Sequence, residues 1–284
     1  MKSVVVTGVS TGIGRACVKV LTASGFRVFG SVRKQTDADG LAKEFGAPFT
    51  PLIFDVTDET AVAASAKQVE ATLRGETLSG LVNNAGVAVP GPLLELEIDE
   101  FRRQIDVNLT GALIVTQAFA PLLGVDRSRK GERGRIVMIS SVGGKNALPF
   151  NGAYSASKFG LEGMSESLRR ELMIFGVDVI VVAPGAVATP IWDKADAVDV
   201  TPFAETPYAP ALARMKRAMV SMVKQGLPAE RIGEAVKIAL TASRPKTRYM
   251  VAPNPMQNLL ALALPKRMVD NMIARRLGLK TGRL

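Results

Sequence analysis

The residues of this chain best suited to acid–base chemistry are Tyr154 and Lys158, four positions apart, with Ser141 thirteen positions before Tyr154. Side chains at i and i+4 lie on one face of a helix, about one turn apart. A free tyrosine has a pKa of about 10, and a neighbouring ammonium lowers that pKa because it favours the phenolate. General acid–base catalysis works best with a pKa near the operating pH, so Lys158 could make Tyr154 catalytic. A solvent-exposed helix face would show the same spacing.

The amino-acid composition leaves few other routes to proton transfer. The 284 residues include no histidine and one cysteine, Cys17. These counts exclude Ser-His-Asp and Cys-His catalysis, metal sites that contain histidine and an intrachain disulfide. Proton transfer must therefore fall to Tyr, Lys, Asp or Glu, and the chain has only three tyrosines. Cys17 follows an apolar helical pattern and is expected to be a small core residue, and no metal site is expected.

The formal charge of +10 indicates polyanionic ligands. Phosphates of a cofactor, an acidic carrier protein or anionic lipid would fit, as would a basic soluble protein with no such ligand. We expect no nucleic-acid partner, because aromatic residues are only 5% of the chain and no basic run is interleaved with them. The sequence shows no leader pattern and no run of about 18 apolar residues, so we expect a cytoplasmic protein without a membrane span.

Short apolar segments rich in β-branched residues alternate with amphipathic segments along most of the chain. Predicted strands cover residues 3–7, 27–31, 50–54, 80–83, 135–140, 178–183 and 249–252. Predicted helices cover residues 12–24, 58–74, 100–123, 154–175 and 229–242. This alternation predicts an α/β fold with a single doubly wound, Rossmann-type parallel sheet of about seven strands and helices on both faces. A Pro-punctuated insert, residues 190–228, and a basic, partly apolar tail, residues 253–284, lie outside the alternation.

A glycine-rich segment follows the first predicted strand and opens the first predicted helix. Glycines permit a tight turn and let the backbone approach a pyrophosphate at a helix N-terminus, where N–H groups and the helix dipole favour anions. The spacing Thr-Gly-x-x-x-Gly-x-Gly over residues 7–14 differs from the standard G-x-G-x-x-G, but it stands between a strand and a helix, as such a motif must. A plain glycine turn is the alternative. The candidate phosphate-binding residues are Gly8, Ser10, Thr11, Gly12, Ile13 and Gly14.

The end of the second predicted strand bears on the choice of dinucleotide. Folds that bind NAD usually place an acidic residue here, where it contacts the ribose 2′-hydroxyl. This strand end carries Arg33 and Lys34 instead. A guanidinium suits a 2′-phosphate because its donors form a planar fork. We therefore predict NADP(H) rather than NAD(H), while two solvated surface charges remain the alternative.

Five motifs occur in an order that resembles the short-chain dehydrogenase/reductase (SDR) family over residues 1–252. They are the glycine segment 7–14, residues 83–86 (Asn-Asn-Ala-Gly), Ser141, the Tyr154-x-x-x-Lys158 step and the Pro184-Gly185 pair. The long insert, the Arg33-type strand end and the tail are similar to the 17β-hydroxysteroid and retinol dehydrogenase branch of that family. The resemblance implies one Rossmann-fold domain that includes the insert as a lid, with residues 253–284 as a helical extension packed on the domain or on a partner.

The resemblance also implies a role for each matching residue. Ser141 would bind the substrate oxygen and Tyr154 would exchange the proton. Lys158 would bind the nicotinamide ribose and lower the pKa of the tyrosine, and Asn108 would hold a water in the proton relay. The cofactor would further contact Asp55, Val56, Asn83, Ala85, Gly86, Pro184, Gly185, Val187 and Thr189. One departure concerns Thr11, where some NADP-using members carry a basic residue, so Arg33 would hold the 2′-phosphate mostly alone.

The apolar side chains around the insert predict a lipophilic substrate, while burial of these side chains in the domain's own core is the alternative. The candidate substrate contacts are Ser141, Val142, Phe150, Ile191 and Trp192. We expect a ketone, an aldehyde or a secondary alcohol, steroid-like or retinoid-like. The alternatives are a reductase of 3-oxoacyl chains on a carrier protein and a non-catalytic NADP-binding sensor. The family resemblance implies a homodimer or homotetramer, and the tail could pack on its own domain, on a partner subunit or on an anionic membrane surface.

Overall fold

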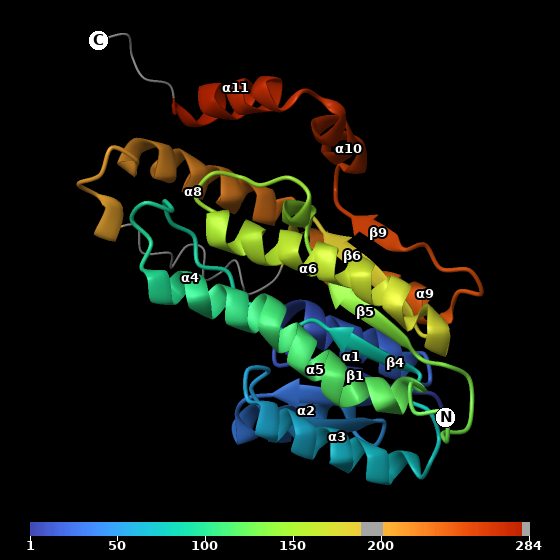
Figure 1. Cartoon of the computed structure of the whole chain (residues 1–284). Coiled ribbons are helices and arrows are strands. Elements are labelled where there is room, and N and C mark those ends of the chain that lie inside the picture. The colour runs from blue at the N-terminus through green and yellow to red at the C-terminus, as the bar shows by residue number, and fades with distance from the viewer. Residues whose placement is uncertain (189–200, 280–284) are drawn as a thin grey trace.

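The computed structural model describes residues 1–188 and 201–279, and its centre is a seven-stranded parallel sheet (Figure 1). The strands lie in the order β3-β2-β1-β4-β5-β6-β9. Their bounds are Ser3–Val6 (β1), Arg27–Val32 (β2), Phe49–Ile53 (β3), Gly80–Asn83 (β4), Arg135–Ile139 (β5), Asp178–Pro184 (β6) and Arg248–Val251 (β9). The predicted doubly wound sheet is therefore confirmed, and every predicted strand is present with ends within one residue of the expected position.

The strand order reverses at β1, which pairs with β2 on one side and with β4 on the other. In open parallel sheets, ligands bind outside the carboxyl ends of the strands at such a reversal. The strands are almost entirely apolar because both faces of the sheet are covered. The loops that follow β1, β4 and β5 consequently lie at one edge of the sheet, and these loops contain the glycine segment, Gly86 and Ser141.

Helices cover both faces of the sheet, and each face has its own core. One face carries α1 (Gly12–Ala23), α2 (Gln35–Phe45) and α9 (Glu230–Thr241), and the other carries α3 (Glu59–Leu73), α5 (Gly111–Phe119) and α6 (Gly152–Glu171). Successive side chains of a strand point to opposite faces, so Val4 and Val6 join the first core and Val5 joins the second. The sequence did not predict α2, because only Ala38 and Leu41 of that helix are buried and its apolar stripe is narrow.

A continuous helical segment, Ile98–Leu123, crosses the second face beneath the site. It consists of α4 (Ile98–Ile105), a π-helical turn η1 (Asp106–Thr110), α5 and a 3₁₀ turn η2 (Ala120–Leu123). Within the described residues it is the one helical stretch long and apolar enough to span a membrane by length and composition, a test that core helices also pass. Its Gln104, Asn108, Val115 and Phe119 are buried within the domain, as expected of a core helix.

The insert begins and ends at one short two-stranded sheet. β7 (Val187–Ala188) pairs in parallel with β8 (Leu227–Pro228), so both ends of the insert are held at the same edge of the domain. Between them lie a 3₁₀ turn η5 (Thr201–Phe203) and a long helix, α8 (Ala209–Lys224), which the sequence did not predict. Phe203 and Tyr208 pack with the buried side of α8.

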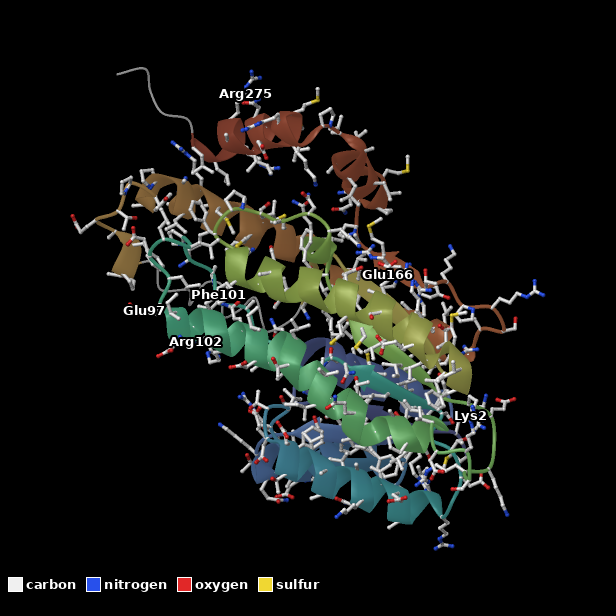
Figure 2. All side chains as sticks on the ribbon, in the orientation of Figure 1. Lys2, Glu97, Phe101, Arg102, Glu166 and Arg275 are labelled. Atoms are coloured by element: carbon white, nitrogen blue, oxygen red, sulfur yellow. The ribbon has the colours of Figure 1, made fainter. Side chains whose placement is uncertain are left out.

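The tail continues from β9 as α10 (Pro255–Ala263) and α11 (Lys266–Leu277). One side of α11 packs on α8 through Leu277 and Ile273, and Arg214 Nη1 donates a hydrogen bond to the Leu277 carbonyl at 2.9 Å. Figure 2 shows Arg275 projecting from the opposite side of α11, away from the domain. Large apolar side chains of the two helices are also exposed, namely Met256, Leu259, Leu260, Leu262, Met268 and Met272.

Candidate active site

The structure brings the four predicted catalytic residues together at the carboxyl edge of the sheet. Ser141 follows β5, Tyr154 and Lys158 lie on the first turns of α6, and Asn108 lies in the π turn η1. The side chains of Ser141 and Tyr154 are hydrogen-bonded. Lys158 Nζ lies 5.8 Å from the centroid of the Tyr154 ring. A Cβ atom added to Gly86 would lie 3.1 Å from Asn108 Oδ1 and 3.7 Å from Lys158 Nζ, so both polar groups lie close to this glycine.

Ser141 is held by its own backbone turn. It caps the 3₁₀ turn η3 (Val142–Gly144), where its Oγ accepts a hydrogen bond from Gly143 N–H at 3.0 Å. A hydroxyl has one hydrogen to donate besides its lone pairs. The Ser141 hydrogen is therefore available to the Tyr154 oxygen or to a substrate oxygen at the same place.

Lys158 is buried and points back to the end of β5. Its Nζ donates to the Ile139 carbonyl at 2.9 Å, and the whole residue is 5% exposed. Burial lowers the pKa of Lys158 to about 8, while the carboxylate of Glu162 raises it. The ammonium is thus held in a poorly solvated position where a single neighbouring charge has a large effect.

The pKa of Tyr154 moves in the direction opposite to the expectation from the sequence. Burial raises the pKa of Tyr154, and the hydrogen bond from Ser141 lowers it by less. The predicted net fall of this pKa is therefore not found, because burial of the phenol is the largest effect, and the contribution of Lys158 stays a prediction. Tyr154 carries its proton at neutral pH, which suits a proton donor.

Asn108 fixes the loop after β4 with both ends of its amide. Its Oδ1 accepts from Val87 N–H at 2.8 Å, and its Nδ2 donates to the Val87 carbonyl at 2.9 Å and to Ser157 Oγ at 3.0 Å. These three contacts join the π turn to the loop and to α6. Its role in holding a water remains a prediction from the family.

The glycine loop fits a pyrophosphate at the N-terminus of α1. Gly8 and Gly12 have φ of 68° and 59°, where other residues are strained. A Cβ atom added to Gly14 would lie 2.2 Å from the Gly8 carbonyl oxygen, so the turn closes only around a glycine. Thr11 precedes the helix without capping it through its side chain, which leaves the first N–H groups for an anion. Ser10 and Ile13 lie in the same turn.

Asn84, a member of the motif at residues 83–86 with no role assigned from the sequence, is a structural part of this loop. Its Nδ2 donates to the carbonyls of Thr7 and Gly8 at 2.8 and 3.0 Å. Thr7 Oγ1 in turn accepts from the N–H groups of Asn84 and Ala85. The only signal in the sequence for this structural role of Asn84 was its place beside Asn83, a predicted cofactor contact. Asn83 itself is buried and donates to Thr116 Oγ1 at 2.9 Å, which turns its amide toward the core.

Arg33 follows β2 at the same edge of the sheet, and its side chain is mostly exposed. Its side chain is 73% exposed, and its Nη1 lies 3.8 Å from Asp55 Oδ2. Asp55 also accepts hydrogen bonds from Thr57, and Val56 is buried beside it. The pair places one cation and one carboxylate next to each other at the ends of β2 and β3.

The predicted nicotinamide contacts after β6 are only partly described. Gly185 N–H donates to the Val251 carbonyl at 2.8 Å, and a Cβ atom added there would lie 2.6 Å from Ala252 Cβ. The close approach of β9 therefore accounts for this glycine. Pro184 ends β6, and Val187 is buried in the first core. Thr189, Ile191 and Trp192 lie outside the described residues.

An apolar cluster joins Phe150, just before α6, to the insert and to the tail. Phe150 precedes α6 with φ of 64°, a strained conformation for a bulky residue. Its ring meets Tyr208 edge to face, with centroids 5.9 Å apart. The cluster also includes Phe203, Ala211, Leu212, Met215, Met219, Ile273 and Leu277. Val142 is half-buried in the turn after Ser141.

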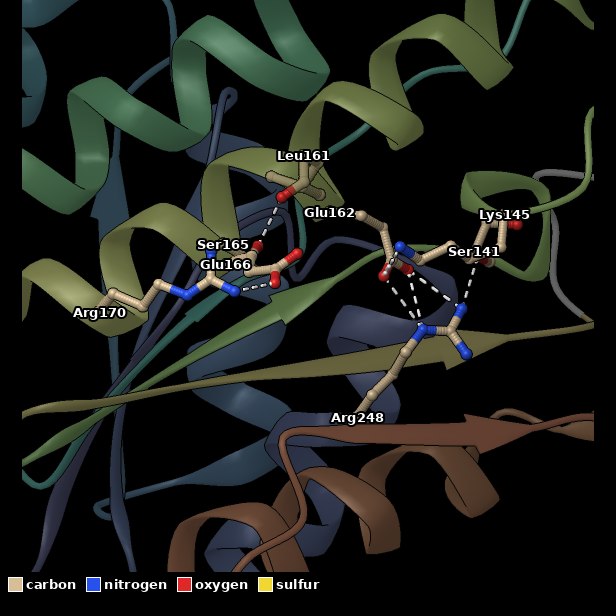
Figure 3. A network of polar contacts seen from close by, with 8 residues as sticks. All are labelled: Ser141, Lys145, Leu161, Glu162, Ser165, Glu166, Arg170 and Arg248. Atoms are coloured by element: carbon tan, nitrogen blue, oxygen red, sulfur yellow. Dashed lines mark hydrogen bonds and ion pairs between the residues drawn. The ribbon is translucent and has the colours of Figure 1, made fainter.

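A second polar network adjoins the site and was not foreseen (Figure 3). Glu162 lies one helical turn after Lys158 and is buried, and Arg248 reaches it from the start of β9. Arg248 Nε donates to both Glu162 carboxylate oxygens at 3.1 Å. Arg248 Nη2 lies 3.5 Å from the Ser141 carbonyl oxygen, and Lys145 Nζ lies 3.9 Å from Glu162 Oε2.

Within the described residues, no cluster of His, Cys, Asp or Glu could hold a metal ion.

Comparison with known proteins gives relatives over nearly the whole chain. A family model described as short chain dehydrogenase matches residues 2–199. The chain is 40% identical over 273 residues to the NADPH-dependent 3-dehydrocapnine reductase of Ornithobacterium rhinotracheale, covering 96% of each protein. It is 34% identical to retinol dehydrogenase 5 of Homo sapiens, covering 95% of this chain and 87% of the relative. The crystal structure of a short-chain dehydrogenase from Streptomyces avermitilis aligns with a TM-score of 0.77 at 26% identity, covering 99% of this chain and 98% of that chain.

Proposed function

The chain belongs to the short-chain dehydrogenase family, and on that premise we propose that it transfers a hydride between NADP(H) and a lipophilic ketone, aldehyde or secondary alcohol. Membership confirms the expectation of an oxidoreductase that acts on CH–OH and C=O groups, and the retinol dehydrogenase relative confirms the predicted branch.

The observation that carries the proposal is the hydrogen bond between Ser141 and Tyr154 beside the buried ammonium of Lys158. When bound, NADPH supplies the hydride. Ser141 donates a hydrogen bond to the substrate oxygen, where negative charge develops. Tyr154 gives its proton to the same oxygen, and its raised pKa keeps that proton in place until it is needed. Lys158 brings positive charge beside the phenol as the phenolate forms.

The cofactor would lie along the carboxyl edge of the sheet. The glycine loop, with its uncapped helix N-terminus, would hold the pyrophosphate, and Gly86 leaves room beside Asn108 and Lys158. Asp55, Val56, Asn83 and Ala85 lie along the same edge. Arg33 is exposed and reachable by a 2′-phosphate. Its position and the NADPH-dependent relative both support NADP(H) over NAD(H).

The substrate class is proposed from the apolar cluster beside Tyr154. Phe150 precedes α6, Tyr208 and Met215 lie in the insert, and their aromatic and thioether side chains pack together in this cluster. The relatives include a reductase named for 3-dehydrocapnine and a dehydrogenase named for retinol. These names support a reaction at a carbonyl or an alcohol carbon.

An NADPH-oxidation screen tests the proposal. The panel holds 3-dehydrocapnine, retinal, steroid ketones, simple ketones and aldehydes, and 3-oxoacyl chains on a carrier protein. We expect turnover with one of the lipophilic carbonyl compounds and weaker turnover with short ketones. Turnover restricted to carrier-linked chains would replace the proposal with the 3-oxoacyl reductase alternative. NADPH binding without turnover across the panel would favour the non-catalytic sensor.

We further propose a homodimer or homotetramer in which a second copy covers the outer face of α10. Met256, Leu259 and Leu260 are 77%, 53% and 60% exposed on a nine-residue helix without charge. Light scattering of the chain and of a Leu259→Glu/Leu260→Glu variant measures the assembly, and we expect the variant to dissociate. Flotation with phosphatidylglycerol vesicles tests the alternative that α10 binds an anionic membrane. If the unmodified chain is a monomer that floats with the vesicles and the variant does not float, membrane binding would replace the proposed oligomer. The cytoplasmic location stays a prediction.

A further inference from the structure

Outside the proposed catalytic set, Glu162 and Arg248 form an ion pair between α6 and β9 (Figure 3). The Glu162 side chain is 5% exposed and the Arg248 side chain 25%. Three hydrogen bonds of 3.1 Å join them, two from Nε and one from Nη2 of the guanidinium. The pair links β9, at the edge of the sheet, to the catalytic helix α6, although the residues are 86 positions apart in the chain.

Burying such a pair is costly, so its position requires a reason. Each charge loses most of its hydration, and the mutual attraction seldom offsets that loss by much. An apolar contact between β9 and α6 would hold the two elements equally well. The neighbours of the pair therefore matter more than its contribution to folding.

Each member of the pair lies next to a residue of the catalytic centre, Glu162 on the same helix face as Lys158 and Arg248 at the backbone of Ser141. Glu162 follows Lys158 by one turn of α6, and its carboxylate acts on the Lys158 ammonium. Arg248 Nη2 lies 3.5 Å from the carbonyl of Ser141, the residue whose hydroxyl meets Tyr154. One ion pair thus acts on the lysine from one side and on the serine backbone from the other.

We propose that Glu162 and Arg248 are positioning residues that hold the Lys158 ammonium and the Ser141 turn in place for proton transfer. This inference rests on the proposed oxidoreductase function. Glu162 supplies the negative charge that keeps Lys158 protonated at neutral pH. Arg248 limits that influence, because it neutralises part of the carboxylate, and anchors the backbone from which Ser141 projects.

The charged and titratable groups around Lys158 come from several elements. On α6 itself these are Tyr154 and Glu162, and β9 contributes Arg248 through its contact with Glu162. The turn after β5 contributes Lys145, whose Nζ lies 3.9 Å from Glu162. β5 presents only the Ile139 carbonyl, and the π turn presents the neutral amide of Asn108 through Gly86. Glu162 is the one anion of this set.

The same helix provides a matched control. Glu166 and Arg170 form an ion pair one turn further along α6, also drawn in Figure 3, with side chains 48% and 65% exposed. This pair is local, solvated and remote from Ser141 and Lys158. Exposed pairs of this kind contribute little to stability, so Glu166→Gln and Arg170→Met remove equivalent charges without touching the site.

The direct test is a titration of the Lys158 amine by nuclear magnetic resonance in lysine-labelled protein, assigned with a Lys158→Met variant. In the unmodified chain we expect a midpoint of about 8. Glu162→Gln removes the favourable charge, so the midpoint falls, by about one pH unit. Arg248→Met removes a repulsive charge and leaves Glu162 unshared, so the midpoint rises. Arg248→Lys keeps the positive charge but loses the planar fork of donors, so its midpoint should lie between those of the unmodified chain and Arg248→Met.

Kinetics provide the second measurement. We expect kcat for NADPH-dependent reduction to fall about tenfold in Arg248→Met, because the Ser141 turn shifts, with KM for NADPH nearly unchanged. The alkaline limb of the pH profile moves to lower pH in Glu162→Gln and to higher pH in Arg248→Met. The Glu166→Gln and Arg170→Met variants should match the unmodified chain in both measurements.

Opposite shifts of the Lys158 midpoint support the proposal even if no carbonyl substrate is found, since the titration needs none. Equal midpoints in all variants would overturn it, and so would shifts of the same sign in Glu162→Gln and Arg248→Met. A loss of thermal stability without any midpoint shift would assign the pair a purely structural role. Absence of turnover in the unmodified chain would count against the proposed function alone.

Discussion

The cofactor edge of the site and its substrate side are built from different parts of the polypeptide. At the cofactor edge, the conformation of the main chain forms the site: Gly8 and Gly12 adopt positive φ, and Gly14 lets the turn close. On the substrate side, long side chains from segments far apart in the sequence meet, as Phe150, Met215 and Leu277 do. The first arrangement tolerates almost no added atom, whereas the second can repack, since methionine and aromatic side chains adapt to new shapes.

This difference predicts that changes on the two sides will separate cofactor affinity from substrate affinity. Substitutions in the glycine loop should weaken NADPH binding and leave substrate preference alone. Substitutions in the apolar cluster should do the reverse.

Among the substitutions that compare the two sides, Gly14→Ala should have the largest effect. The new Cβ would lie 2.2 Å from the Gly8 carbonyl oxygen, so the backbone of the loop must move. A shift of the loop away from its anion-binding geometry should raise the dissociation constant of NADPH at least about 100-fold, measured by fluorescence titration.

Gly40→Ala is the control for this change. It lies on α2 in the same half of the domain, and an added Cβ would meet nothing within 4 Å. We expect unchanged NADPH affinity and a small gain in stability, about 0.5 kcal/mol. Equal affinity in the two variants would show that the glycine loop does not hold the cofactor.

Arg33→Ala should produce the next largest effect, and only with one cofactor. A charge-assisted contact to the 2′-phosphate is worth about 1.5–3 kcal/mol, or roughly 10- to 100-fold in affinity. NADPH binding should weaken by that factor, while NADH binding should change less than about twofold because NADH lacks the phosphate. Equal losses for both cofactors, measured in parallel titrations, would remove Arg33 from the 2′-phosphate site.

Met215→Ala tests the substrate side and should have the smallest effect on function. The residue is 6% exposed within the apolar cluster, so its truncation should destabilise the fold by about 2 kcal/mol. KM for the lipophilic substrate should rise several-fold, with NADPH affinity unchanged. A matching loss of NADPH affinity would show that the two sides of the site are not independent. Met222, exposed on the same helix, supplies the control substitution.

The two sides also differ in what the sequence could predict. The strands and the glycine loop were predicted because buried parallel strands are continuous apolar runs and because a tight phosphate turn requires glycine at fixed positions. The helix periodicity of α6 likewise brought Tyr154 and Lys158 together. These are local properties of the chain.

Contacts between distant segments were not predictable in this way. Arg248 has no local signal for its pairing with Glu162, since sheet topology alone brings β9 beside α6. Glu162 could have been noticed, because it follows Lys158 by four residues. The direction of the Tyr154 pKa was predicted wrongly, since the neighbouring lysine is visible in the sequence but the burial of the phenol depends on tertiary packing.

The central claim is that Tyr154 transfers the proton while other residues hold the cofactor. The most direct test measures Tyr154→Phe in two ways, as kcat for NADPH-dependent carbonyl reduction and as the dissociation constant of NADPH. We predict a fall in kcat of about 1,000-fold and an NADPH dissociation constant within about twofold of the unmodified chain. Unchanged turnover, or a loss of NADPH affinity as large as the loss of turnover, would contradict this account of the site.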